Sequence, residues 1–150
     1  MTSKLYLVMS RISTFLVINT LISDRLSVAL FKEKKLISKK ELKVGWQQAE
    51  KLLKLINQLL INTKVKLEDL SGIIGVRGPG SFTAVRIGCL VVNTLSYSLK
   101  IPAVGLKLNE FKDYSELIDK GREKIKKKKS FSLVQPFYGR SPNITKPRKK

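Results

Sequence analysis

The chain has 150 residues, a length at which one domain buries roughly two-thirds of the surface that its unfolded form exposes. Hydrophobic residues make up 43% and charged residues 27%, as in folded globular proteins, which excludes disorder along the whole chain. Lysine and arginine number 30 against 11 acidic residues. The formal net charge of +19 therefore either favours polyanionic partners such as RNA or reflects lysines spread over solvated faces.

The chain has no histidine and one cysteine, Cys89. This composition excludes an intramolecular disulfide, a zinc site built from cysteine and histidine, and the catalytic pairs that depend on histidine. A lone cysteine fits a reducing cytoplasm, where we expect the protein. Arg11 interrupts the apolar run at 5–9 and no cleavage pattern follows, so we expect no secretory signal. We also expect no membrane association, because no apolar run reaches membrane-spanning length.

The predicted domain begins with strands. Residues 14–20 and 26–31 are short runs of apolar and β-branched residues with a polar stretch between them, which predicts two strands joined by a turn. A third strand is expected at 35–39. From 45 to 62 the apolar residues recur at helical spacing with polar residues opposite, which predicts an amphipathic helix.

A buried strand and a second helix are predicted next. Residues 70–76 are apolar without polar alternation and precede a glycine-rich turn, as in a strand covered on both faces. The segment 82–99 is predicted to be a helix with Ser81 or Thr83 as its N-cap. It is apolar on more than one side, so the sheet and a further element have to cover it. A last strand is expected at 101–106.

The string from Gly75 to Gly88, GVRGPGSFTAVRIG, is the most informative segment. Glycines allow a sharp backbone turn, and the free N–H groups at the start of the following helix suit an anion or a phosphate group. The string also fits a tight strand-to-helix connection that binds nothing, because it is neither a Walker A loop nor G-x-G-x-x-G. The turn residues singled out are Gly78, Pro79, Gly80, Ser81, Thr83 and Arg86.

This string resembles the signature of the TsaB family, also called YeaZ, in which G-x-G-P-G-S-F-T-G-x-R-I-G leads into a helix of the first lobe. Other segments resemble the family in the expected order: FLVINT at 15–20, SVAL at 27–30, EKLL at 50–53, IPAVG at 101–105 and YGRSP at 138–142. The resemblance implies an α/β fold of the actin-like, ribonuclease-H-like (ASKHA) class, a mixed sheet with flanking helices.

Members of the family carry a second lobe, which residues 107–130 are too few to build. The resemblance therefore implies a shortened form with a TsaB-like first lobe at 14–106, a basic helix or linker at 107–130, and a retained basic tail at 131–150. In the superfamily a carboxylate on the first strand helps to hold a metal-bound nucleotide, and Asn19 stands at that position. A neutral amide lacks this charge, so we expect no catalytic residue, no metal and no cofactor.

Three further positions depart from the family pattern. Gln48 stands for the histidine and Lys54 for the proline of the family's H-S-E-x-L-L-P helix, and Ala84 stands for a glycine of the signature. These changes leave the predicted helices intact.

The resemblance implies a non-catalytic partner of the TsaD-type enzyme, which makes threonylcarbamoyl-adenosine in tRNA. Family members form a heterodimer with TsaD through first-lobe helices, so that tRNA is reached through the complex. A TsaE-type ATPase as a further partner and pairing of two copies of the chain are open alternatives.

Two apolar helix faces exceed what one small sheet can cover, and such exposed surfaces mark interfaces. We expect the two helices to pack side by side, with Gly88 and Ala84 allowing close approach and with Leu53 and Ile56 facing outward. The residues expected at the partner interface are Trp46, Leu53, Ile56, Leu60, Val85, Gly88 and Val92.

Two other functions stay open. A small phosphate- or nucleotide-binding enzyme would use the turn from Gly78 to Ser81, but it needs a carboxylate to hold a metal, and the motif contains none. A basic RNA-binding module would use the C-terminal region, although its few aromatic residues give little support for base stacking. The residues expected to contact RNA are Lys126, Lys127, Lys128, Lys129, Arg148, Lys149 and Lys150.

Overall fold

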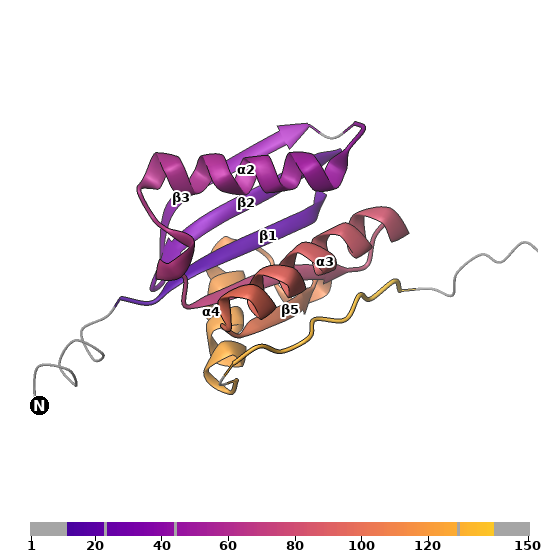
Figure 1. The fold of residues 1–150 in the computed structure, drawn as a ribbon. Coiled ribbons are helices and arrows are strands. Elements are labelled where there is room, and N and C mark those ends of the chain that lie inside the picture. Colours follow the sequence, from indigo (N-terminus) through magenta and orange to yellow (C-terminus); the bar gives the residue numbers. More distant parts are fainter. Residues whose placement is uncertain (1–11, 23, 44, 129, 140–150) are drawn as a thin grey trace, which may run out of the picture.

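Five strands form one mixed sheet in the order β3-β2-β1-β4-β5, seen in the computed structural model of the chain (Figure 1). The structure describes residues 12–22, 24–43, 45–128 and 130–139. The first three strands pair antiparallel, and β4 and β5 add to β1 in parallel. The strands are β1 (Thr14–Ile22), β2 (Arg25–Lys32), β3 (Lys35–Lys43), β4 (Gly72–Gly78) and β5 (Ala103–Lys107).

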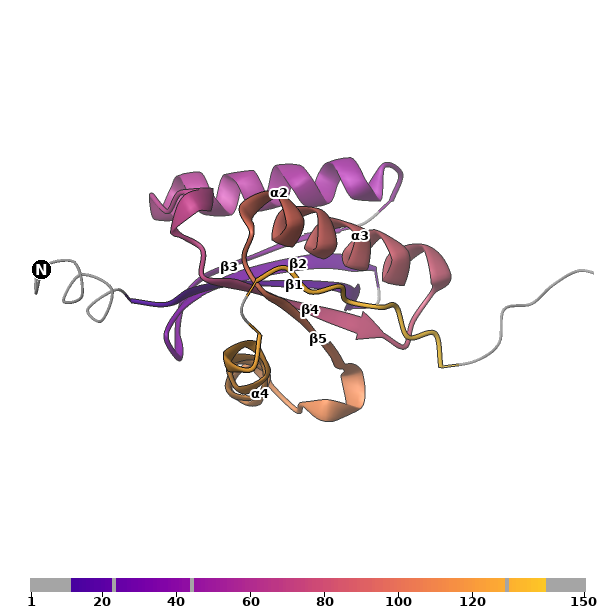
Figure 2. The same ribbon diagram turned by 60° about the horizontal axis from the view of Figure 1, so that its bottom comes forward.

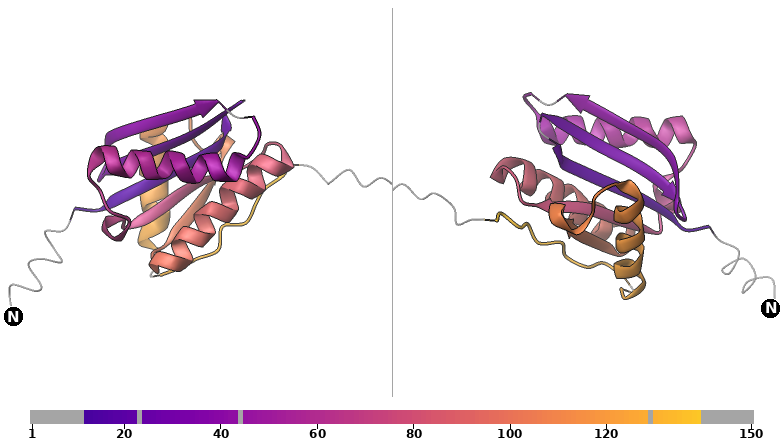
Figure 3. Two further views of the ribbon diagram at one scale, coloured as in Figure 1. Left: turned by 45° about the horizontal axis from the view of Figure 1, so that its top comes forward. Right: turned by 180° about the vertical axis from the view of Figure 1, so that it is seen from behind.

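Helices cover both faces of this sheet. Figure 3 shows α2 (Gln48–Thr63) and α3 (Phe82–Leu99) together on one face in its left view and α4 (Tyr114–Lys126) on the other face in its right view. The 3₁₀ turns η1 (Leu67–Asp69) and η2 (Leu108–Glu110) lead into β4 and toward α4. The predicted mixed sheet with flanking helices is therefore confirmed.

Side chains alternate along the central strands because successive residues point to opposite faces. On β1, Leu16 and Ile18 pack in the core under α2 and α3, whereas Phe15 and Val17 pack in the core under α4. All four are at most 4% exposed. The apolar runs predicted as strands thus fill two cores, one on each side of the sheet. Figure 2 shows α2 and α3 on one side of the sheet and α4 on the other.

Two predicted boundaries differ from the structure. The third strand extends to Lys43 rather than ending near Lys39, because its polar end continues to pair with β2 up to Arg25. The helix predicted from residue 45 begins at Gln48, so Trp46 lies before it. Pairing with β2 sets the end of β3, whereas α2 begins after Gln47, whose backbone is in the left-handed conformation with φ of 61°.

Residues 107–128 form η2 and α4, which pack onto the second face of the sheet. The side chain of Asp113 caps α4, because its Oδ1 accepts from the Glu116 N–H at 2.9 Å. Leu117 and Ile118 are each 1% exposed and enter the core. This segment was predicted as a basic helix or linker, and its apolar side covers β-strand residues that would otherwise face water.

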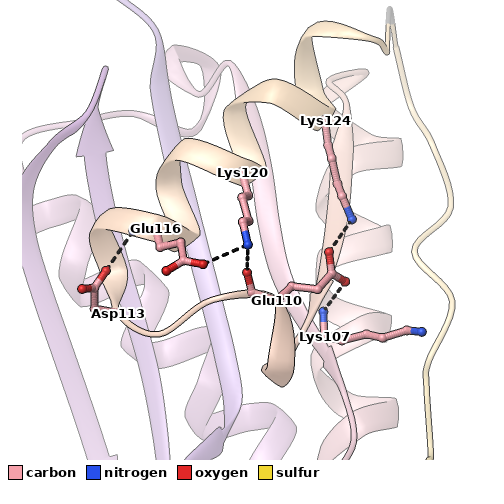
Figure 4. Close-up of polar contacts among 6 residues, drawn as sticks. All are labelled: Lys107, Glu110, Asp113, Glu116, Lys120 and Lys124. Atoms are coloured by element: carbon pink, nitrogen blue, oxygen red, sulfur yellow. Dashed lines mark hydrogen bonds and ion pairs between the residues drawn. The ribbon is translucent and has the colours of Figure 1, made fainter.

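Glu110 ties η2 to α4 (Figure 4). Its carboxylate accepts from the Lys107 N–H at 3.0 Å and from Lys124 Nζ at 3.0 Å. Its backbone carbonyl accepts from Lys120 Nζ, which also reaches Glu116 at 2.9 Å. The end of β5 and the start of α4 are thus held together by a small network of charged hydrogen bonds.

By length and composition alone, α3 is the helix of the described residues that could cross a membrane. This finding corrects the expectation that no apolar run reaches that length. Val85 and Val92 of α3 are at most 1% exposed and belong to the core between α3 and the sheet. A buried core helix passes the same test of length and composition.

Candidate functional site

The glycine turn, residues 78–81, connects β4 to α3. Ser81 Oγ accepts from the Ala84 N–H at 3.2 Å, so Ser81, and not the alternative Thr83, is the N-cap of α3. Gly78 has φ of 138°, a conformation that glycine adopts and L side chains rarely do. A Cβ at this position would also run into the carbonyl oxygen of Phe137. The turn therefore needs glycine at 78 for its own geometry and for a close contact with a distant segment.

That distant segment, residues 130–139, is called the C-terminal segment below, and it runs alongside α3 (Figure 1). The Phe137 N–H donates to the Arg77 carbonyl at 2.8 Å. The Tyr138 ring packs edge-on against Phe82 with centroids 4.7 Å apart, and its hydroxyl accepts from Arg86 Nε at 3.0 Å. Arg86 and the Ala84 N–H are thus engaged within the chain. This is the arrangement expected if the turn serves as a structural connection between β4 and α3.

The end of β1 lies against the first turns of α3. Asn19 is 6% exposed, and its Oδ1 accepts from the Leu21 N–H at 2.9 Å. Thr20 Oγ1 donates to the Ala84 carbonyl at 2.7 Å. The described residues contain no group of three or more His, Cys, Asp or Glu placed to hold a metal ion. A metal-bound nucleotide would therefore meet a neutral amide at position 19, with its oxygen already bonded to Leu21, rather than a carboxylate.

The structure divides the expected interface residues into a buried set and an exposed set. Ile56 is 4% exposed, so the expectation that it faces outward is wrong. Gly88 faces Thr20 of β1, and the expectation that it lets the two helices approach each other is wrong as well. The exposed residues are Trp46 at 88% and Leu53 at 52%. The residues packed in the chain's own core are Ile56, Leu60, Val85, Gly88 and Val92.

An apolar groove opens beside Leu53, at the C-terminal half of α2. It has a volume of about 590 Å³ and is lined by α2, by η1 and by Leu95 of α3. Ile61 and Leu67 in its walls are 64% and 37% exposed. Sequence analysis missed both residues, because Ile61 lies outside the apolar stripe of the helix and Leu67 stands in a polar stretch. Their contribution depends on how η1 folds back beside α2.

The residues expected to contact RNA fall partly outside the described structure. Lys126, Lys127 and Lys128 are exposed at the C-terminal end of α4. Lys129 and residues 140–150, which include Arg148, Lys149 and Lys150, lie outside the described residues. The expected tail at 131–150 is therefore described only up to residue 139.

The sheet order, the helices on both faces and the glycine turn between β4 and α3 define a lobe of the actin-like, ribonuclease-H-like class. The family model described as TsaD, tRNA N6-adenosine threonylcarbamoyltransferase, matches residues 44–123. Among curated relatives, the tRNA threonylcarbamoyladenosine biosynthesis protein TsaB of Buchnera aphidicola subsp. Schizaphis graminum (strain Sg) is 36% identical over 116 residues, 77% of this chain and 52% of that protein. The TsaB of Bacillus subtilis (strain 168) is 34% identical over 77 residues, 51% of this chain and 34% of that protein.

A solved structure of YeaZ from Pseudomonas aeruginosa is similar as well. It superposes with a TM-score of 0.59 at 33% identity, over 63% of this chain and 44% of that one. The chain belongs to the TsaB/YeaZ family, within the group that the TsaD family model describes. It spans about half the length of the curated TsaB protein from Buchnera that it matches, and less of the one from Bacillus.

Proposed function

We propose that this chain acts in the formation of threonylcarbamoyl-adenosine in tRNA, as a non-catalytic partner of a TsaD-type enzyme. The observation that carries the proposal is the apolar groove beside Leu53, on a helix of a TsaB-type lobe. Exposed apolar surface of this kind is typical of protein interfaces. Membership of the TsaB/YeaZ family supports the pathway, and the groove supports an interface with a partner.

The groove suits a helical partner segment. Leu53 and Ile61 lie two turns apart on α2, so their side chains project from the same side of the helix. An apolar helix laid along them would bury both side chains, together with Leu67. Complete burial of a leucine contributes about 1.5–3 kcal/mol, and Leu53 is half-exposed, so about 1 kcal/mol is gained at this residue alone.

The engaged groups of the glycine turn and of β1 support the non-catalytic part of this proposal. Asn19 Oδ1 is bonded within its own strand, and Arg86 is bonded to Tyr138. A phosphate-binding enzyme would need these groups free and a carboxylate beside them. The purified chain is therefore expected to show no ATP turnover, and a stoichiometric ATPase activity lost in Ser81→Ala would contradict this part of the proposal.

The partner role is tested by co-purification and titration with the TsaD-type protein of the same organism. Leu53→Glu places a carboxylate in the groove, where burial without a partner costs several kcal/mol, so binding should weaken more than about 100-fold. Gln58→Glu is the matched control, because Gln58 is exposed on α2, lies outside the lining of the groove and gives the same change in net charge.

Circular dichroism establishes that both variants keep the fold. If folded Leu53→Glu binds the TsaD-type protein as tightly as the parent chain, the groove is not the interface. Size-exclusion chromatography of the parent chain alone distinguishes pairing with a second copy from pairing with the enzyme. A dimer that Leu53→Glu converts to a monomer, without any effect on TsaD binding, would assign the groove to self-association instead.

A further inference from the structure

A second groove lies across the free edge of β5, between the end of α4 and the C-terminal segment. It has a volume of about 490 Å³. Four cationic side chains line it and none of its described lining residues is acidic; the cations are Arg77, Lys124, Lys127 and Lys128. Lys124 is bonded to Glu110 at 3.0 Å, whereas Lys127 and Lys128 are exposed. The groove is therefore basic, with two of its lysines open to solvent.

Hydrogen bonds hold the wall of this groove in place. Ser132 Oγ donates to the Ala103 carbonyl at 2.6 Å on the outer edge of β5. Arg77 Nε donates to the Gln135 carbonyl at 2.8 Å. Val134 is 4% exposed and exchanges two hydrogen bonds with the side chain of Asn93, at 2.8 and 2.9 Å. A fixed wall matters because a site that exists before binding loses less conformational entropy when its ligand arrives.

An exposed aromatic pair stands at one end of the C-terminal segment. Tyr97, near the end of α3, is 72% exposed and Phe131 is 39% exposed. Their rings meet edge-on with centroids 5.5 Å apart. Both line a hollow of about 450 Å³ that also includes Lys100. A flat, apolar group that covers these rings would remove them from water, which lowers the free energy.

We propose that single-stranded RNA binds to this basic groove and to the aromatic pair, which the C-terminal segment links through the consecutive residues Phe131 and Ser132. Lys127 and Lys128 contact successive phosphates, and Tyr97 with Phe131 offers a ring on which an unpaired base stacks. Cations spread along a groove beside exposed aromatic rings are the combination that binds single strands without sequence preference. An isolated phosphate would not use the aromatic pair, and a duplex keeps its bases stacked inside.

The proposal stands apart from the partner role, because the isolated chain carries the whole groove. The test is fluorescence anisotropy with a labelled single-stranded RNA of about 12 nucleotides, within the usual site size for such grooves. Lys127→Gln with Lys128→Gln removes two charges from the groove. Lys35→Gln with Lys43→Gln removes the same charge from β3, at the opposite edge of the sheet, and serves as the matched control.

Each phosphate contact to a single strand contributes about 0.7 to the slope of log Kd against log salt concentration. The groove variant should therefore lower this slope by about 1.4, a difference of about sevenfold between about 50 and about 200 mM salt. The control variant should lower this slope less than the groove variant does. An equal fall of the slope in the two variants would mean that net charge alone attracts the RNA, which would refute the proposed site.

The aromatic half of the site has its own test. Tyr97→Phe keeps the ring and should bind as the parent does, whereas Tyr97→Leu keeps only the apolar bulk and should bind at least about fivefold more weakly. Double-stranded RNA of the same sequence should compete poorly. A Tyr97→Leu variant that is folded by circular dichroism and binds like the parent, or a duplex that competes as well as the single strand, would refute the stacking proposal.

Discussion

The seating of α3 on the sheet depends on Gly88, and Gly88→Ala tests it. A Cβ at residue 88 would lie 2.7 Å from Thr20 Oγ1 and 3.3 Å from Thr20 Cγ2. Thr20 cannot simply rotate away, because its hydroxyl donates to the Ala84 carbonyl at 2.7 Å and the residue is 4% exposed. Overpacking of this kind costs about 1–3 kcal/mol, and loss of the hydrogen bond costs about 1 kcal/mol more.

Replacing glycine by alanine inside a helix also stabilises it, by about 1 kcal/mol. The net expectation for Gly88→Ala is therefore a loss of about 1–3 kcal/mol in the free energy of unfolding. Urea unfolding followed by far-ultraviolet circular dichroism measures this loss, and an unchanged m-value would show that the denatured state is not affected. Ser98→Ala, at an exposed position of the same helix, is the control for helix propensity.

A double-mutant cycle separates the steric clash from other effects. In a Thr20→Ala background the two nearest atoms are gone, and the remaining contact to the Cβ of residue 20 is an ordinary 3.6 Å. Gly88→Ala should then be neutral or stabilising, with a coupling energy of about 2 kcal/mol between the two sites. A stabilising effect in the parent chain, or an equal loss in both backgrounds, would refute the reasoning.

Three further outcomes are expected. Burial raises the pKa of Glu110, but hydrogen bonds from the Lys107 N–H and the Lys124 ammonium outweigh it and hold this pKa below its ordinary value of 4.5. The carboxylate thus stabilises the fold above pH 4.5 and loses this effect as the pH falls through its lowered pKa. Glu110→Gln should cost about 1 kcal/mol at neutral pH and flatten the fall of the unfolding free energy below pH 4.5, as urea titrations at several pH values would measure; an unchanged pH profile would contradict it. Burial likewise raises the pKa of the Cys89 thiol, so thiol-reactive dye should label Cys89 far more slowly in native protein than in urea; equal rates would show an accessible thiol. Gln48 Oε1 is buried without a hydrogen-bond partner among the described residues, so Gln48→Met should raise the free energy of unfolding by about 1 kcal/mol, and a loss of stability would indicate a partner that the amide needs.

The amino-acid sequence by itself determined the approximate positions of the five strands, of α2 and α3, and of the glycine turn. Apolar and β-branched runs located the first two strands, and a change to helical spacing located α2. Ser81 or Thr83 was predicted as the cap of α3 because short polar side chains bond the free N–H groups of a first helical turn, and the structure has Ser81 in this role. These are local properties of the chain, and a periodic pattern carries them without knowledge of the partner segments.

Only the tertiary structure decided which apolar side chains stay exposed. Leu53 and Ile56 are three residues apart on one helix, yet the first is 52% exposed and the second 4%. The rotation of α2 over the sheet sets this difference. The apolar stripe of α2 is wider than the surface that packs on the sheet, so the sequence does not show where the buried part of the stripe ends. Gly88 meets β1 rather than α2, and Tyr97 meets Phe131, for the same reason. Contacts between segments distant in the chain follow from how whole layers of side chains pack together, which local periodicity does not encode.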